Sequence, residues 1–265
     1  MQSINGLFEK PEGAIPPLSG AVTRLMKMPQ KAMLREVLST IRTDTELSDD
    51  VLRMADNHYY SGRRPIRNLP ELIVRLGLGS VRGLALRTTL DRTVFDDGPM
   101  MQRLKNHSTV TAYITTAISQ HASVNSETAF HCALLQHIGV AVPLGMMTKS
   151  NGREIEEAMM WEALGCANKA IAGLVAETWE LPETIRSVLV QHHRFGKVAD
   201  INHVIATLII AEVLACELDL GLDSDEHPVP SDDLIDAALT QLDLPASQLP
   251  SIAGTASELL DRVSA

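Results

Sequence analysis

Aromatic residues and cysteines are scarce in this chain. Aromatic residues make up 3% of the 265 positions, and a core built instead from Leu, Ile, Val, Ala and Met favours helices over a β-sandwich. The three cysteines, Cys132, Cys166 and Cys216, form an odd and widely spaced set. Such a set argues against a disulfide framework and fits a reducing compartment. We therefore expect an all-α protein located in the cytoplasm.

Excess positive charge and long apolar runs are also missing. The chain has 23 Lys and Arg against 33 Asp and Glu, a net charge of −10. An acidic chain is a poor default binder of nucleic-acid phosphates, so no DNA partner is expected. The longest strongly apolar stretch, residues 204–211, is much shorter than the ~20 residues of a membrane-spanning helix. The first residues contain no apolar run of signal-peptide length, so no membrane association is expected either.

Apolar residues recur at helical spacing through nearly the whole chain. Ser19 and Asn68 are predicted helix N-caps, and the turn at 77–80 is predicted to separate a short helix from a longer one. The segment 95–99 combines acidic residues, Gly and Pro, and is the predicted boundary between two helical units. Beyond it we expect helices at 100–120, 126–144 (kinked or ended at Pro143), 155–164, 168–180, 182–193, 201–220, 232–242 and 246–263.

Charge is distributed unevenly along the chain. Residues 63–92 contain seven arginines and two acidic residues, whereas residues 217–236 contain eight acidic residues and no Lys or Arg. Both segments can be read as solvated helix faces. The alternative is that Arg63, Arg64 and Arg67 bind an anion or an acidic partner and that the acidic segment is an interaction tail.

Histidines and one glutamate form the only grouping in the sequence that suggests chemistry. His107, His137, the pair His192–His193 and Glu212 fall on successive predicted helices, and helices of a bundle can direct such groups to one interior point. Imidazole and carboxylate together are ligands for a divalent metal such as Zn, Fe, Mn or Ni. The spacing matches neither a zinc finger nor an HExxH helix, so packed, hydrogen-bonded histidines remain an equally physical interpretation.

A series of segments follows one another in a specific order and spacing. They are AIPPLSGAVTRLMKM, the segment from TIRTDTELSDD to GSVRGLAL, NHSTVTAY, AFHCALLQHIGVAVPLGMM, the run from WEALGCANKA to VLVQHH, and ATLIIAEVLACELDLGL. Through these segments the chain resembles the HDOD domain family, a group of degenerate relatives of the HD metal-dependent phosphohydrolases. The resemblance covers about 15–222 and implies a small helical subdomain packed on an HD-like helical bundle. The organisation it implies is an N-terminal extension (1–14), a subdomain of about five helices (15–95), the HD-like subdomain (96–222) and a C-terminal helical extension (223–265).

The resemblance also implies a metal site that this chain has partly lost. His107 occupies the position of the first HD ligand, and the His-Asp pair that names the superfamily corresponds to Gln136 and His137. Asn168 replaces a further histidine, and Glu212 replaces the closing aspartate. His192 and His193 keep the double histidine of the family. The implied ligands for a single metal are His107, His137, His192 and Glu212.

These replacements weaken the case for hydrolysis. A phosphodiesterase-type site uses His and carboxylate ligands to hold one or two metals that generate hydroxide. Gln136 offers only a neutral amide, and the extra methylene of Glu212 displaces its carboxylate by about 1 Å, where sites tolerate about 0.5 Å. We therefore expect no catalytic residue, and the resemblance then implies a non-catalytic bacterial regulatory or signal-transduction module.

The expected partner is a signalling protein bound in trans, with a cyclic dinucleotide or another nucleotide as an alternative ligand and a homodimer as a further form. No cofactor is expected beyond a single Zn, Mn, Fe or Ni ion. The alternative function is a metal-dependent phosphohydrolase with a rearranged HD site.

Overall fold

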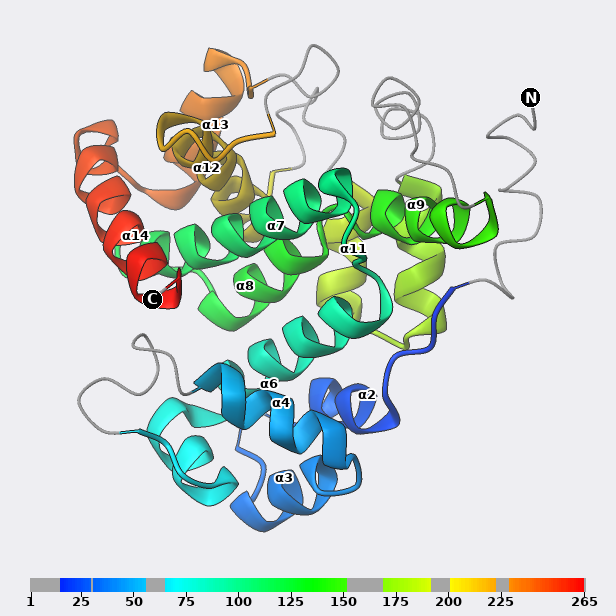
Figure 1. The fold of residues 1–265 in the computed structure, drawn as a ribbon. Helices are drawn as coiled ribbons and strands as arrows, with labels where there is room; N and C mark the ends of the chain where they lie inside the picture. The colour runs from blue at the N-terminus through cyan, green and yellow to red at the C-terminus, as the bar shows by residue number, and fades with distance from the viewer. Residues whose placement is uncertain are drawn as a thin grey trace.

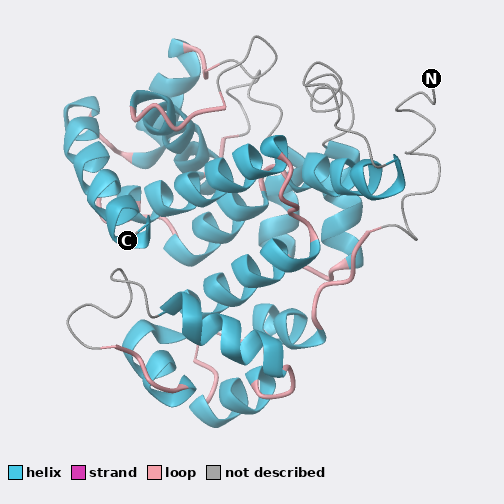
Figure 2. Cartoon of the chain, viewed as in Figure 1, coloured by secondary structure: helices cyan, strands magenta, loops and turns pink. Residues whose placement is uncertain are grey.

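The computed structural model describes residues 15–29, 31–55, 65–151, 169–191, 201–222 and 229–264. Every regular element in these ranges is a helix, as Figure 2 shows, which confirms the predicted all-α class. The predicted helix at 155–164 and the predicted extension at 1–14 lie outside the described residues.

The described part of the N-terminal unit, at the bottom of Figure 1, contains α2 (Gly20–Lys27), α3 (Leu34–Ile41), α4 (Thr45–Ala55) and α6 (Leu69–Thr93). The predicted caps are confirmed, because the Ser19 side chain accepts a hydrogen bond from the amide of Ala21 and Asn68 accepts one from Glu71. Gly77 interrupts α6 with φ 75° and ψ 166°. That conformation is open essentially to glycine alone, so α6 consists of the predicted short helix followed by the longer one.

The second unit is built around α7 (Pro99–Ile118) and α8 (Ser126–Leu135), which pack against each other. Around them lie α9 (Ile138–Asn151), a helix at 169–178, α11 (Glu183–Gln191) and α12 (His203–Glu217). The C-terminal elements α13 (Asp232–Leu242), η3 (Ala246–Gln248) and α14 (Leu249–Ser264) complete the chain. Helix α13 packs on α12 and α14 packs on α7 (Figure 1).

One hydrophobic core runs through both units, from Val22 and Leu25 in α2 to Ile252 and Ala256 in α14. Helix α6 connects the units, since it packs on α2, α3 and α4 and also on α8. The subdomain limits remain predictions based on the resemblance.

The predicted continuous helix at 126–144 is wrong in one respect. The helix breaks at Gln136 and His137, and α9 then runs through Pro143 instead of ending there. Pro143 is the sixth residue of α9, so its missing N–H costs one backbone hydrogen bond near the helix start. The break places Gln136 and His137, both 1% exposed, in the interior.

Within the described ranges, one helical stretch, Ser126–Met146, is long and apolar enough to cross a membrane by composition. Its most apolar window is 89% buried inside the protein. A buried, apolar helix of this kind is typical of a protein core.

Candidate metal centre

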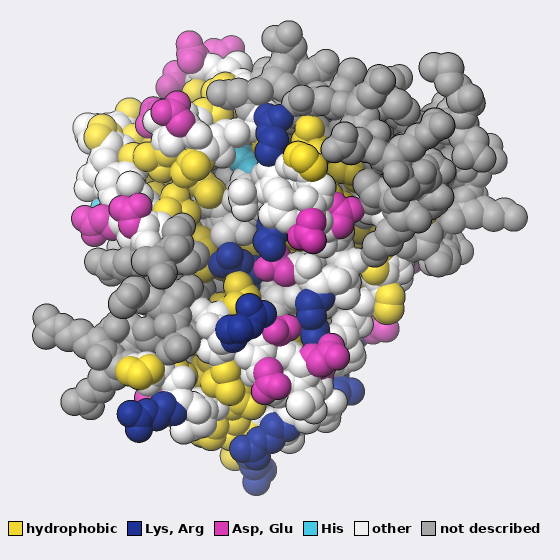
Figure 3. Space-filling model, in the orientation of Figure 1, with side chains coloured by type: hydrophobic (Ala, Val, Ile, Leu, Met, Phe, Trp, Pro, Cys, Tyr) yellow, Lys and Arg dark blue, Asp and Glu magenta, His cyan; other side chains and the backbone are white. Residues whose placement is uncertain are grey.

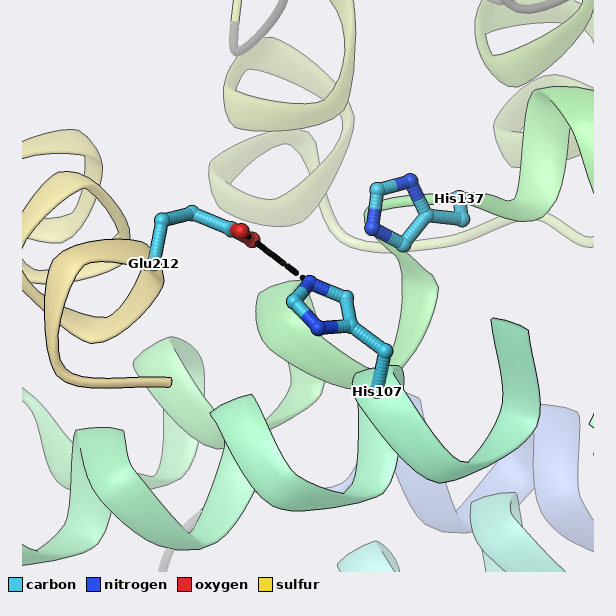
Figure 4. A group of neighbouring side chains, drawn as sticks. All are labelled: His107, His137 and Glu212. Atoms are coloured by element: carbon cyan, nitrogen blue, oxygen red, sulfur yellow. Dashed lines mark hydrogen bonds and ion pairs between the residues drawn. The ribbon is translucent and has the colours of Figure 1, made fainter. Parts of the chain in front are cut away.

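His107 on α7 is held at both ring nitrogens by α12 and the turn that follows it. Its Nε2 lies 3.0 Å from the carboxylate of Glu212, and its Nδ1 lies 3.1 Å from the backbone carbonyl of Leu220. A carbonyl oxygen only accepts hydrogen bonds, so Nδ1 carries the proton and donates it to Leu220. Nε2 is thereby directed at Glu212, as Figure 4 shows.

The C-terminal end of α12 positions the carbonyl of Leu220. Asp219 adopts a left-handed conformation with φ 58°. The amides of Leu220 and Asp219 then donate to the carbonyls of Ala215 (2.8 Å) and Cys216 (3.0 Å). This pair of hydrogen bonds is a Schellman motif, which turns the chain sharply at a helix end. Helix α12 and the turn that ends it therefore supply both partners of the His107 ring.

His137 faces His107 from the break between α8 and α9. The two ring centroids are 5.2 Å apart with planes tilted by 46°. One ligand atom each from His107, His137 and Glu212 lie within 4.8 Å of one another. All three residues are at most 3% exposed, and they converge from three segments far apart in the sequence (Figure 4).

Gln136 is oriented across the helix pair toward α7. Its side-chain amide donates to the hydroxyl of Thr111 (2.9 Å), and that hydroxyl donates to the backbone carbonyl of His107 (2.9 Å). Gln136 thus connects the end of α8 to the turn of α7 that carries His107.

The donor set fits one divalent transition metal. Two imidazoles and one carboxylate are a common set for Zn, Fe, Mn or Ni. The Nδ1–H of His107 bonded to a carbonyl is the arrangement that orients a histidine ligand toward a metal. A two-metal hydrolytic site needs more anionic ligands to hold both ions. In the described part of the chain, the cluster of potential metal ligands consists of these three residues, of which one is anionic.

The structure brings together three of the four predicted ligands: His107, His137 and Glu212. Their role in metal binding remains a prediction. The other predicted positions His192, His193, Asn168, Arg63 and Arg64 lie outside the described residues. Arg67 is exposed, and its backbone amide bonds the carboxylate of Glu71 (3.2 Å).

Sequence reasoning missed the contributions of Leu220 and Thr111. A backbone carbonyl leaves no side-chain signature, so nothing in the sequence singles out Leu220. Thr111 lies four residues after His107 on the same face of α7, and this spacing is the signal that could have identified it.

Several solved structures have the same fold, and their names give either a domain family or a candidate function. An HDOD domain protein of unknown function from Geobacter sulfurreducens superposes with a TM-score of 0.69 at 19% identity, covering 97% of each chain. A candidate metal-dependent phosphohydrolase from Shewanella amazonensis gives a TM-score of 0.69 at 15% identity, covering 96% of this chain and 97% of that one. A candidate signal transduction protein from Marinobacter aquaeolei gives 0.65 at 18%, covering 94% and 58%.

At these identities the structures establish the fold alone. Among the curated proteins no match is found. The family model of the HDOD domain, however, matches residues 15–195, well over half of the sequence. The chain therefore belongs to the HDOD domain family.

Proposed function

We propose that the chain is a regulatory or signal-transduction module that acts by binding a partner and does not hydrolyse phosphoesters. The observation that carries this proposal is the position of Gln136. It stands where the resemblance implies a histidine ligand, and its amide is hydrogen-bonded to Thr111. Among the described residues three donors lie near one another, fewer than the two bridged ions of a phosphodiesterase-type site require.

The burial of the centre supports the same function. The side chains of His107 and Glu212 are 1% and 4% exposed, so little donor surface is open to a phosphate. A metal that activates water for hydrolysis keeps a coordination position open to substrate. The His107–Glu212 contact is suited to holding α7 against α12.

The proposed partner is a signalling protein bound in trans, with a nucleotide as the alternative ligand. The solved relative from Marinobacter carries a signal-transduction name, and the N-terminal unit presents an exposed Arg67, which follows the predicted Arg63 and Arg64 in the sequence. Guanidinium groups bind carboxylates and phosphates through paired hydrogen bonds. Reversal of these three charges should abolish capture of the partner. A partner that binds the reversed variant equally well contradicts this surface.

Elemental analysis combined with an activity assay tests the absence of catalysis. Protein purified without chelator should contain at most one transition metal per chain and should not hydrolyse cyclic or linear phosphodiesters above a heat-inactivated control. Two metals per chain, together with hydrolysis that is lost in His107→Ala, would establish the alternative phosphohydrolase.

A second candidate is a phosphohydrolase with a single metal, favoured by the convergence of His107, His137 and Glu212. It predicts a higher Tm on addition of Mn²⁺ or Zn²⁺, since an ion at 100 times its Kd stabilises the folded state by about 2.7 kcal/mol. Glu212→Gln should remove this increase, whereas His121→Gln, which changes an exposed histidine, should retain it. An unchanged Tm in the wild-type protein rules this candidate out.

A further inference from the structure

An apolar pair flanked by two cations projects from the N-terminal unit. Met33 and Leu34 are 53% and 39% exposed, although most large apolar side chains of this protein are buried. Lys31 and Arg35 lie on either side of them and are exposed. The nearby Glu36 carboxylate accepts a hydrogen bond from the backbone amide of Met33 (3.3 Å). We call Lys31, Met33, Leu34 and Arg35 the basic knob.

An open groove of matching character lies at the C-terminal end of α13 and in the turn that follows it. Its volume is about 580 Å³, and its lining consists of Asp236, Leu239, Thr240, Asp243, Leu244 and Pro245. Asp236 and Asp243 are exposed, whereas Leu239 is half-buried and Leu244 is buried. Two carboxylates therefore flank an apolar floor. We call these six residues the acidic groove.

The spacing of the charges is similar on the two surfaces. Asp236 lies in α13 and Asp243 directly follows its last residue, so the two are seven residues apart, about 10 Å at the helical rise of ~1.5 Å per residue. Lys31 lies three residues before α3, which begins at Leu34, and Arg35 is the second residue of that helix. At ~3 Å per extended residue before the helix, the two cations are again about 10 Å apart along the backbone. The basic knob can thus place one cation near each carboxylate and an apolar side chain between them.

The knob and the groove cannot meet within one molecule. Figure 1 shows α3 and α13 at opposite ends of the protein. Figure 3 shows acidic side chains over α13 at one end and basic and hydrophobic side chains near α3 at the other. Two such surfaces can meet only between two copies of the chain.

We propose that the basic knob of one molecule docks in the acidic groove of another, so that the protein associates head to tail. The two surfaces differ, so the contact is heterologous and generates an open chain or a ring. One short segment in one groove buries less surface than a permanent interface. The association is therefore weak, concentration-dependent and reduced by salt, because exposed charges are screened.

Sedimentation velocity over a concentration series tests this proposal. At about 20 mM salt, the wild-type protein should shift to larger species as its concentration rises, and at about 500 mM salt it should stay monomeric, because the screening length falls about fivefold. Lys31→Glu with Arg35→Glu gives a knob that the acidic groove repels. Asp236→Lys with Asp243→Lys gives a groove that the basic knob repels. Each double variant alone should remain monomeric at every concentration.

Mixing the two double variants provides the decisive measurement. The first retains the native groove and the second the native knob, while their altered surfaces carry opposite charges. The mixture should therefore associate although neither component does. Asp97→Lys with Asp261→Lys makes the same charge change at exposed positions outside the groove and should leave wild-type behaviour intact. A monomeric wild type at low salt, or double variants that associate like the wild type, overturns the proposal.

Discussion

Individual buried residues carry features that sequence reasoning could not assign. The sequence contains nine histidines, and nothing near His131 in the sequence distinguishes it from the others. In the structure it is 3% exposed on α8. Burial, and secondarily the positive charge of Arg82, lowers the pKa of His131 to about 3. The folded protein therefore keeps this imidazole neutral under conditions in which an unfolded chain protonates it.

This pKa predicts a loss of stability in mild acid. Between pH 6.5 and about 3, the unfolded chain binds a proton at His131 and the folded protein does not, so stability falls as the pH falls. At about 1.36 kcal/mol per pH unit, the loss reaches about 2 kcal/mol by pH 5. Urea titrations at pH 7.5 and 5.0 should show this loss in the wild type.

Two matched variants separate the contribution of His131 to the pH dependence of stability from that of the other titrating groups. His131→Leu should lack the additional 2 kcal/mol, while His121→Leu, at an exposed position, should retain it. Equal pH dependence of wild type and His131→Leu would contradict a neutral buried imidazole.

The resemblance identifies the candidate ligands, because their residue types and order are retained in the sequence. It does not predict which groups these residues contact. The His107–Leu220 bond depends on a turn in which Asp219 takes a left-handed conformation, and this conformation is unusual for a non-glycine residue. Gln136 was expected near the histidines, and its bond to Thr111 depends on how α7 and α8 pack.

At the scale of elements, local signals set most helix ends but not the break at Gln136–His137. Asn and Ser caps and the glycine of α6 act through nearby backbone groups, so the sequence predicts them. Helix α13 also has the predicted bounds, Asp232–Leu242, although its N-cap residue Ser231 makes no side-chain cap hydrogen bond. No glycine or proline marks the break after α8. It follows from tertiary contacts of two buried polar side chains, which outweigh local preference.

Glycine substitutions in α6 and α14 should have opposite effects. A Cβ at Gly77 meets no atom within 4 Å, so Gly77→Ala is opposed by its backbone conformation alone. It should destabilise the protein by about 1–3 kcal/mol. Gly254 is also unobstructed, but it is an exposed position inside a regular helix. Gly254→Ala should stabilise by about 0.5–1 kcal/mol. Thermal unfolding measures both, and a change of the same sign in the two variants would contradict the kink.

At the scale of the whole molecule, Arg82 joins the two units. Its guanidinium donates to the Glu127 carboxylate at the start of α8 (2.7 Å) and to the carbonyls of Met28 and Pro29 (3.2 Å for Pro29) after α2. The Arg82 side chain is 5% exposed. The seven arginines of residues 63–92 thus include one that is structural, a distinction that charge counting alone cannot make.

Removal of Arg82 should weaken the entire fold. Arg82→Met leaves Glu127 and two carbonyls without their donor and should cost about 3 kcal/mol, a value typical of breaking a buried ion pair. Arg75→Met removes a more exposed partner of Glu71 and should cost less than about 1 kcal/mol. Urea unfolding gives both values, and similar costs in the two variants would show that Arg82 does not anchor the units.

The His107 ring is contacted at both nitrogens by α12 and the turn after it, and this arrangement has a mechanical consequence. Glu212 and the Leu220 carbonyl contact different nitrogens of one ring, so sliding α12 past α7 by a single residue, about 1.5 Å, would disturb both contacts together. The two contacts therefore favour one register of α12 against α7. A shift of the whole of α12 away from the ring would therefore also displace the turn at Leu220 and affect α13, which packs on α12.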